Sequence, residues 1–151
     1  MSPAYYDANY LFKLQVLETG SADVRAHAAT VFEIHTAVHG RAEFASAAFR
    51  KIREGTATPA DFQRLIAQFS EDVASTTIVL LPLTDPILDR VETVFANANA
   101  TTYLRAADAL HLAAAAENGF TEIHSSDKHL LAAAPLFGLC GVNVIQYPAA
   151  G

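Results

Sequence analysis

The stretch Tyr5-Tyr6-Asp7-Ala8-Asn9-Tyr10-Leu11 decides the fold, because it joins a short strand directly to a helix. Residues 4–6, Ala-Tyr-Tyr, form an apolar aromatic run that is typical of a buried strand. Residues 9–17 then carry apolar side chains at helical spacing, and Asp7 lies at the junction. A strand that passes straight into a helix is the repeating unit of a parallel sheet covered by helices.

Strands and helices continue to alternate after this unit. Residues 22–32 fit either one long helix or a helix that leads into a strand, and we assign residues 30–35 to a strand. A helix should begin at Pro59, capped by Thr58, with Asp61 in its first turn. We expect further strands over residues 76–83, 122–125 and 142–146, and further helices over residues 37–52, 85–95, 102–118 and 128–134.

This order predicts an α/β fold, a three-layer α/β/α sandwich with a central, mainly parallel sheet. The 151 residues, 52% of them hydrophobic, suffice for a single domain spanning residues 1–151. No apolar run approaches the ~20 residues that a membrane-spanning helix needs. The N-terminus lacks the basic and apolar regions of a secretory signal, and Cys140 has no second cysteine to pair with. We therefore expect a cytoplasmic protein.

Four acidic residues in separate segments carry most of the functional information: Asp7, Glu43, Asp108 and Asp127. Asp7 and Asp127 follow predicted strands, so both should lie at the carboxyl edge of the sheet, where ligands bind in such folds. Glu43 and Asp108 lie in helical patterns beside apolar positions that face inward. Clustered carboxylates repel one another unless cations neutralise them, and carboxylate oxygens are preferred ligands of hard divalent ions. We predict a Mg²⁺ or Mn²⁺ site.

Each acid also has a purely structural explanation. Asp7 and Asp127 fit helix N-caps, and Asp108 fits a first-turn acid favoured by the helix dipole. Glu43 fits a surface residue paired with Arg41 or Arg50. The functional interpretation rests on the four residues taken together, in their order and context.

A second metal site competes with this one in the sequence. His35, His39 and Glu43 follow i, i+4, i+8 spacing, which on a helix would align two imidazoles and a carboxylate as zinc requires. Gly40 interrupts that stretch, and a strand over residues 30–35 would remove His35 from the helix. Both features count against the zinc site.

The sequence resembles the PIN-domain ribonucleases, particularly VapC-type toxins of bacterial toxin-antitoxin pairs. The resemblance covers nearly the whole chain. It lies in residues 5–11, in Ala42-Glu43-Phe44, in Arg105-Ala106-Ala107-Asp108-Ala109-Leu110-His111-Leu112-Ala113 and in Ser125-Ser126-Asp127.

The resemblance implies a PIN-like domain with metal-dependent endoribonuclease activity. Asp7, Glu43, Asp108 and Asp127 match the family's acidic quartet, which serves as the catalytic and metal-binding set for Mg²⁺ or Mn²⁺. It also implies an RNA substrate, a VapB-type antitoxin and a homodimer.

The chain departs from the family pattern at three places. Asn9 stands where Ser or Thr often follows the first Asp, and Ser125 stands where Thr is usual. Both can still donate hydrogen bonds to carboxylates or to water. His39-Gly40-Arg41 replaces the Ser or Thr residues often found ahead of the Glu. This last departure bears on the groups that support the site.

Hydrolysis by metal-activated water is the reaction that the residues support. The sequence has no Cys-His pair, no Gly-x-Ser-x-Gly turn and no glycine-rich phosphate loop to carry acyl transfer or ATP chemistry. His111 is interpreted as a buried residue rather than a catalytic base, and Arg105 as a charge partner of Asp108. The net charge of −6 opposes nucleic-acid binding, but basic residues placed to hold an RNA backbone are Arg41, Arg50, Lys51, Arg53 and Lys128.

The alternative function is a PIN-like protein-binding module with weak or no nuclease activity. Leu11, Leu14 and Leu17, beside the stripe of Phe62, Leu65 and Phe69, could line an apolar groove for an antitoxin peptide. Such stripes are more often ordinary core. The four acids around one cavity would favour the enzyme, whereas scattered acids beside a broad apolar groove would favour the module.

Overall fold

Tyr6 and His124 form a parallel bridge that joins two small sheets into one layer. The computed structural model describes residues 1–148. In the first sheet, β2 (Ile34–Ala37) lies between β1 (Ala4–Tyr5) and β3 (Ile78–Leu81), and in the second, β4 (Glu122–His124) pairs with β5 (Cys140–Val142). Every pairing is parallel, so the strand order across the layer is β3-β2-β1-β4-β5.

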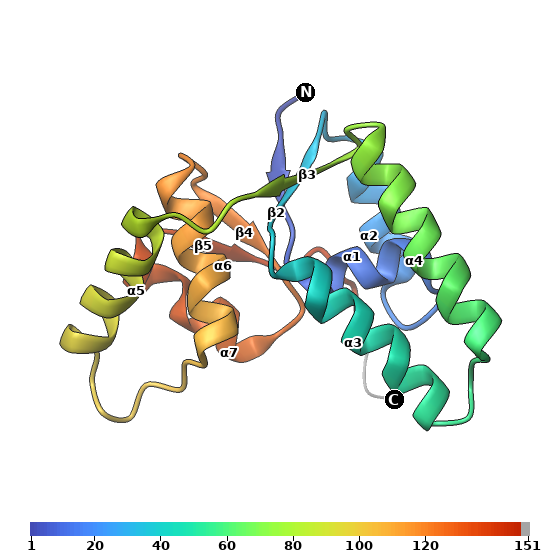
Figure 1. Ribbon diagram of the computed structural model, residues 1–151. Helices are drawn as coiled ribbons and strands as arrows, with labels where there is room; N and C mark the ends of the chain where they lie inside the picture. Colours follow the sequence, from blue (N-terminus) through green and yellow to red (C-terminus); the bar gives the residue numbers. More distant parts are fainter. Residues whose placement is uncertain (149–151) are drawn as a thin grey trace.

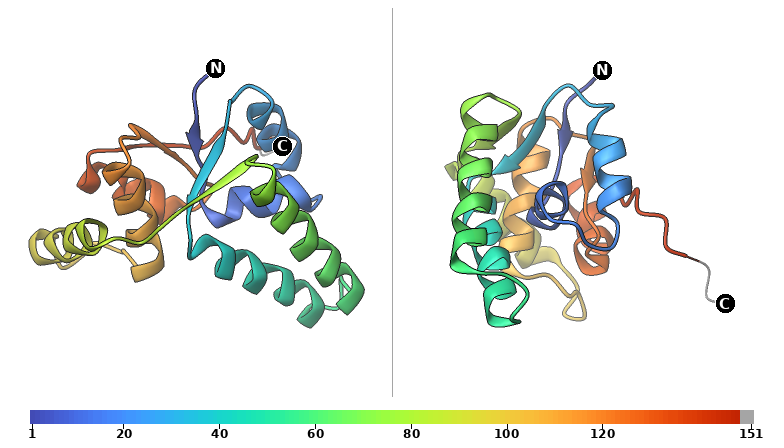
Figure 2. Two further views of the ribbon diagram at one scale, coloured as in Figure 1. Left: turned by 45° about the horizontal axis from the view of Figure 1, so that its top comes forward. Right: turned by 90° about the vertical axis from the view of Figure 1, so that its right-hand side faces the viewer.

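Helices cover both faces of this layer, as Figures 1 and 2 show. One side holds α1 (Ala8–Gln15), α2 (Ser21–Ala28), α3 (Gly40–Arg53) and α4 (Pro59–Ala74). The other side holds α5 (Asp85–Asn97), α6 (Ala106–Glu117), α7 (Lys128–Ala133) and the short 3₁₀ helix η1 (Ala134–Phe137). The three-layer α/β/α sandwich with a parallel sheet is confirmed.

Side chains along β3 point alternately to the two faces of the sheet, and a separate hydrophobic core lies on each face. Ile78 and Leu80 of β3 pack with α1 to α4, whereas Val79 and Leu81 pack with α5, α6 and η1. Successive strand residues point to opposite faces, so a strand covered on both sides must be apolar at every position. The uninterrupted run Ile78-Val79-Leu80-Leu81 meets that requirement.

Helix α6 packs closely against the sheet because its buried face is mostly alanine. Ala109, Ala113, Ala114 and Ala115 are completely buried, and α6 contacts both β2 and β4. Alanine favours the helix and gives up no side-chain entropy on burial. The small side chains let the helix backbone approach the strands, which brings the first turn of α6 to the carboxyl edge of the sheet.

The predicted start of α4 is confirmed in detail. The Asp61 backbone N–H donates to the Thr58 hydroxyl at 3.2 Å, and the Thr58 backbone N–H donates to the Asp61 carboxylate at 2.7 Å. Pro59 occupies the first turn. This reciprocal pair is a capping box, and it satisfies two N–H groups that the helix leaves free.

Four elements have a boundary that lies at least three residues from the predicted one. Strand β2 is Ile34–Ala37 rather than residues 30–35, because Ala4 pairs with Ile34 and residues 21–28 form α2. Helix α3 therefore begins at Gly40 rather than residue 37, which still belongs to the strand. Helix α6 begins at Ala106 rather than residue 102.

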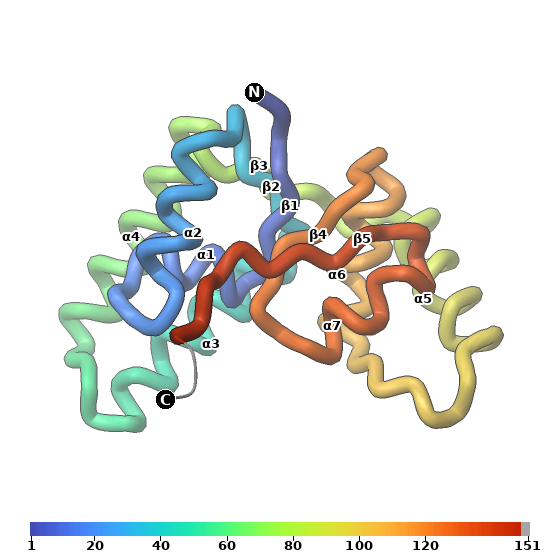
Figure 3. Tube along the Cα trace, turned by 180° about the vertical axis from the view of Figure 1, so that it is seen from behind, coloured from blue at the N-terminus to red at the C-terminus, as the bar shows by residue number. Residues whose placement is uncertain are grey.

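The fourth error concerns the last strand. Strand β5 is Cys140–Val142 rather than residues 142–146. After β5 the chain crosses toward α1 and α2, as Figure 3 shows from behind. There the Asn143 side-chain oxygen accepts a hydrogen bond from the Tyr10 hydroxyl at 2.6 Å, and the Gln146 N–H donates to Asp23 at 2.9 Å. Side-chain partners thus take the place of strand pairing.

Among residues 1–148, none of the helices combines the length and apolar character needed to cross a bilayer.

Candidate active site

Asp7, Glu43, Asp108 and Asp127 line one cavity of about 480 Å³. The cavity lies at the carboxyl edge of the sheet, between α1 and α3 on one side and α6 on the other. The four acids lie at the starts of four helices. Asp7 and Asp127 immediately precede α1 and α7, while Glu43 and Asp108 lie in the first turns of α3 and α6. Tertiary structure thus gathers acids separated by up to 120 residues around one space.

Asp7 is the most buried of the four acids, with 4% of its surface exposed. Its Oδ1 accepts the Tyr10 backbone N–H at 3.1 Å, and its Oδ2 accepts the Ser125 hydroxyl. Burial raises the pKa of Asp7 from its ordinary value of 3.8 to about 6, although the Ser125 hydrogen bond and the His111 charge oppose the rise. The protein alone therefore does not fully offset the cost of burying the ionised Asp7 carboxylate.

Ser125 connects two of the acidic segments. Its hydroxyl donates to Asp7 and accepts the Asp127 backbone N–H at 2.9 Å. The Asp127 carboxylate in turn caps α7 by accepting the backbone N–H groups of His129 and Leu130 at 2.8 and 3.3 Å. Asp7 and Asp127 are thus both N-caps, as the structural explanation holds, and both also face the cavity.

Asp108 is half-buried beside another carboxylate. Burial raises its pKa, and the negative charge of Asp127 raises it further. Arg105 acts in the opposite direction, with its Nε 3.9 Å from Asp108 Oδ2. The expected pairing of Arg105 with Asp108 is confirmed, but the guanidinium is largely exposed and does not cancel the repulsion.

A chain of hydrogen bonds among buried groups fixes the position of the Glu43 carboxylate. His111 Nε2 lies 2.5 Å from Glu43 Oε1, and His111 Nδ1 lies 2.7 Å from the Tyr5 hydroxyl. The Tyr5 hydroxyl also accepts the Ala37 backbone N–H at 2.9 Å. Burial disfavours the Glu43 anion, but the His111 hydrogen bond and the charges of His111 and His39 prevail and lower the Glu43 pKa. Glu43 is therefore ionised at neutral pH.

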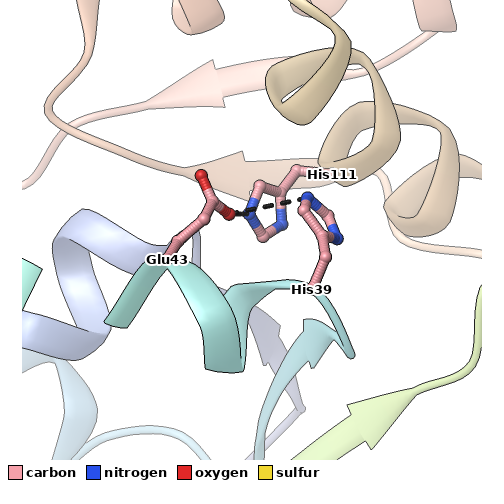
Figure 4. Close-up of side chains that lie close together, drawn as sticks. All are labelled: His39, Glu43 and His111. Atoms are coloured by element: carbon pink, nitrogen blue, oxygen red, sulfur yellow. Dashed lines mark hydrogen bonds and ion pairs between the residues drawn. The ribbon is translucent and has the colours of Figure 1, made fainter. Parts of the chain in front are cut away.

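His39 completes this group from the turn between β2 and α3. Its Nε2 lies 3.5 Å from Glu43 Oε1, and the His39 and His111 rings are 4.1 Å apart between centroids (Figure 4). Burial and the neighbouring His111 charge lower the pKa of His39. His39 Nε2 donates to the Ala107 carbonyl oxygen at 2.9 Å.

The alternative zinc site of His35, His39 and Glu43 does not form, and His35 lies on a strand as the sequence argument against it held. His35 lies on β2 and pairs with Glu33 at 2.9 Å, away from the other two. His111 takes its place beside His39 and Glu43, and this contact was missed. His111 follows Asp108 by three residues on α6, so the sequence placed both on one helix face but could not show that the face meets α3. The predicted burial of His111 is confirmed at 1% exposure.

The predicted RNA-binding residues divide into two groups. Arg50 and Arg53 line the acidic cavity, and Lys128 is an exposed first residue of α7 beside Asp127. Arg41 and Lys51 lie elsewhere: Arg41 borders apolar hollows between α3 and α4, and Lys51 Nζ lies 3.5 Å from Glu18. Asn9 is exposed on the cavity wall. Glu43 pairs with histidines rather than with Arg41 or Arg50.

The acids of the cavity offer carboxylate oxygens, the kind of donor that a hard divalent cation prefers. Carboxylate oxygens surround the space, and two of the carboxyl groups, Asp7 and Asp108, have pKa values raised by burial, so a cation would offset a cost that the protein leaves uncompensated. Within residues 1–148, no three of the four carboxylates bring oxygens within 4.8 Å of one another; the group that does is His39, Glu43 and His111.

Comparison with known proteins identifies the family of this chain. The PIN domain family matches residues 4–135. The chain belongs to the PIN domain family. Members of this family are typically metal-dependent nucleases. None of the curated proteins matches the sequence significantly.

A solved structure of similar fold is that of FitAB bound to an IR36 DNA fragment. One chain of that structure superposes with a TM-score of 0.69 at 11% sequence identity, covering 98% of this chain and 99% of the other. At this identity the similarity concerns the fold alone.

Proposed function

We propose that this PIN domain is an endoribonuclease that depends on Mg²⁺ or Mn²⁺. The observation that carries the proposal is the meeting of Asp7, Glu43, Asp108 and Asp127 at one cavity. Four acids facing one partly buried space are costly for a structural protein, because their charges repel and lose hydration. An activity that uses a bound cation explains why they are there.

Each acid has a role that its surroundings support. Asp7, Asp108 and Asp127 would hold the cation, and Glu43 would serve as a further ligand or as an acceptor for the attacking water. The cation, when bound, lowers the pKa of water and neutralises charge on the phosphodiester. Ser125 fixes the orientation of Asp7 and of the segment that carries Asp127. His111 fixes one oxygen of Glu43 and leaves its second oxygen for water or the cation.

Arginines on the cavity wall suit a substrate with a negatively charged phosphodiester backbone. Arg50, Arg53 and Arg105 line the same space as the acids, so phosphates can meet positive charge on the approach to the cation. Lys128 extends this charge along α7. Single-stranded or looped RNA fits best, because the partly buried cavity must admit a phosphate that a double helix would shield.

The resemblance to VapC-type toxins supports a role as the cytoplasmic toxin of a type II pair, with a VapB-type antitoxin and a homodimeric state. Part of the expected antitoxin groove is core, since Leu11 and Phe69 are buried, while Leu17 is 82% exposed. A hollow between α3 and α4, lined by Val38, Phe62 and Ile66 among others, remains open and apolar. An antitoxin helix or strand could occupy it.

A single experiment tests activity, metal and target together. A mixed RNA pool is incubated with the purified protein in Mg²⁺, in Mn²⁺ or in chelator, and the new RNA ends are sequenced. Cleavage should need the cation and should disappear in Asp7→Asn and Asp108→Asn, while the exposed Asp89→Asn on α5 retains it. Undiminished cleavage by both cavity variants would remove the mechanism, and absence of cleavage by the wild type in either metal would favour the protein-binding module.

A further inference from the structure

Two imidazoles and a carboxylate meet beside the acidic cavity, and Figure 4 shows the three side chains facing one another. One ligand atom each from His39, Glu43 and His111 lies within 4.8 Å of the other two. The three residues come from the turn before α3, the first turn of α3 and the middle of α6. This nitrogen-rich group differs in chemistry from the carboxylates that surround the rest of the cavity.

The chain makes room for this group. A Cβ on Gly40 would lie 2.9 Å from the Thr36 hydroxyl oxygen and 3.3 Å from His111 Cε1. Glycine therefore allows the start of α3 to pass directly over the His111 ring. The residue that counted against a zinc site in the sequence is the one that lets the third ligand approach.

Both rings are already oriented toward Glu43. The Tyr5 hydroxyl holds His111 Nδ1 at 2.7 Å, which leaves Nε2 facing the carboxylate. Histidine ligands of metals commonly have their other nitrogen fixed in this way. His39 Nε2, the nitrogen that faces Glu43, now donates to the Ala107 carbonyl oxygen at 2.9 Å. A metal ion bound there would shift that proton to His39 Nδ1, which is buried and has no hydrogen-bond partner among residues 1–148. His111 is thus already arranged as a ligand, whereas His39 must give up its hydrogen bond to Ala107 to become one.

Two of the three separations between ligand atoms are near those of tetrahedral zinc, and the third is below 4.8 Å. Zinc binds imidazole nitrogen and carboxylate oxygen at about 2.0–2.2 Å, so neighbouring ligand atoms lie roughly 3.3 Å apart. His39 Nε2 and Glu43 Oε1 are separated by 3.5 Å, and His111 Nε2 and Glu43 Oε1 by 2.5 Å. A zinc ion would replace the proton between His111 and Glu43, so that pair must open by less than about 1 Å.

We propose that His39, Glu43 and His111 form a Zn²⁺ site whose occupation inhibits the nuclease. Two imidazoles favour Zn²⁺ over Mg²⁺, which prefers oxygen ligands. The inhibition rests on the proposed function: Zn²⁺ engages the Glu43 oxygen that now faces His111 and adds positive charge beside the position of the catalytic cation. Glu43 would then be shared between an inhibitory and a catalytic state of the same cavity.

Binding is measured first, independently of cleavage. Equilibrium dialysis of the whole protein with Zn²⁺, in excess Mg²⁺ to occupy the carboxylates, should give one bound zinc per chain. His39→Gln should weaken zinc binding at least tenfold, whereas His35→Gln, which removes the His35–Glu33 pair elsewhere on β2, should leave it unchanged. Co²⁺ in place of Zn²⁺ should give the strong visible absorption of a tetrahedral site in the wild type but not in His39→Gln. Circular dichroism verifies that each variant is folded.

Cleavage is measured second. Zn²⁺ titrated into a Mg²⁺-supported reaction should inhibit the wild type and His35→Gln at the concentration that fills the site, and His39→Gln should need at least tenfold more. Equal zinc binding by wild type and His39→Gln would overturn the site, and equal inhibition of the two would overturn the inhibitory role. An inactive wild type that still binds zinc through His39 would retain the site while removing the proposed nuclease.

Discussion

The Ser125 hydroxyl donates a hydrogen bond to Asp7 Oδ2 across 118 positions of sequence, with an oxygen–oxygen distance of 2.5 Å. Ser125 directly follows β4, and Asp7 directly follows the bridge between Tyr6 and His124. The contact therefore crosses the junction between the two small sheets. Because the same hydroxyl accepts the Asp127 N–H, it ties two acids of the cavity to one another.

Ser125→Ala should impair cleavage more than folding. Without the hydroxyl, Asp7 loses a hydrogen bond that favours its ionised form, and the Asp127 N–H loses its acceptor. We expect roughly a tenfold or greater loss of Mg²⁺-supported kcat/KM and a requirement for higher pH. Ser125→Thr keeps the hydroxyl and should restore most of the activity. If the alanine variant cleaves RNA as well as the threonine variant at every pH, the hydroxyl has no role in the site.

Asp7→Asn should stabilise the metal-free protein near neutral pH. The folded-state pKa of Asp7, about 6, exceeds the ordinary value of 3.8, so the folded protein binds this proton more tightly than the unfolded chain does. The resulting stability is fully present below about pH 3.8 and is lost as the pH rises through about 6. Removing the ionised group should raise the free energy of unfolding at pH 7.5 by roughly 1–3 kcal/mol.

Urea titrations of wild type and Asp7→Asn in chelator, from pH 4 to pH 8, measure this difference. The gain should shrink as the pH falls, because the wild-type carboxyl becomes protonated. A gain of equal size at pH 4 and pH 8 would show that the ionisation of Asp7 is not its cause.

Gly40→Ala should disturb the contact between His111 and Glu43. The added methyl would press on the Thr36 hydroxyl and on the His111 ring, which is completely surrounded by protein. We expect a loss of roughly 1–3 kcal/mol in the free energy of unfolding and lower activity. Thr36→Ala removes the closest atom, so the double variant should recover part of both losses. Strictly additive effects in thermal unfolding would contradict this steric explanation.

Arg50→Ala and Arg53→Ala should weaken RNA binding in a salt-dependent manner. Both arginines line the cavity, and each phosphate contact that is lost should reduce the slope of log Kd against log salt by about 0.7 for single strands. Arg64 lies on α4, with a largely exposed side chain, and Arg64→Ala serves as the control. Fluorescence anisotropy with single-stranded RNA in Ca²⁺ measures binding without requiring cleavage. A slope unchanged from wild type in the cavity variants would place the RNA elsewhere.

Thr58→Ala tests whether the protein can lose folding stability without losing cleavage activity. It removes the cap of α4, outside the acidic cavity, and should lower the free energy of unfolding by about 1 kcal/mol. Activity at a temperature well below the unfolding transition should remain at the wild-type level. A large loss of activity in a folded Thr58→Ala protein would mean that α4 is coupled to the site.

The helices and strands that sequence predicted well are those whose signals are local. Thr58, Pro59 and Asp61 specify the start of α4 through contacts within four residues. The short, partly β-branched run of residues 78–81, ended by Pro82, favours a strand buried on both faces. Strand β5 was misplaced because its position depends on pairing with β4, and because the apolar residues that follow it serve a different core through Ile145. No local pattern distinguishes those two kinds of burial.

The amino-acid sequence by itself determined the α/β order, the family and the four acidic positions, because each is expressed in residue type and short-range spacing. Only the tertiary structure decided that Ser125 links Asp7 to Asp127 and that His111, rather than His35, joins His39 and Glu43. These contacts depend on how far β4 lies from β1 and how closely α6 approaches α3. Such distances follow from the packing of the whole sheet and its helices, and no single segment encodes them.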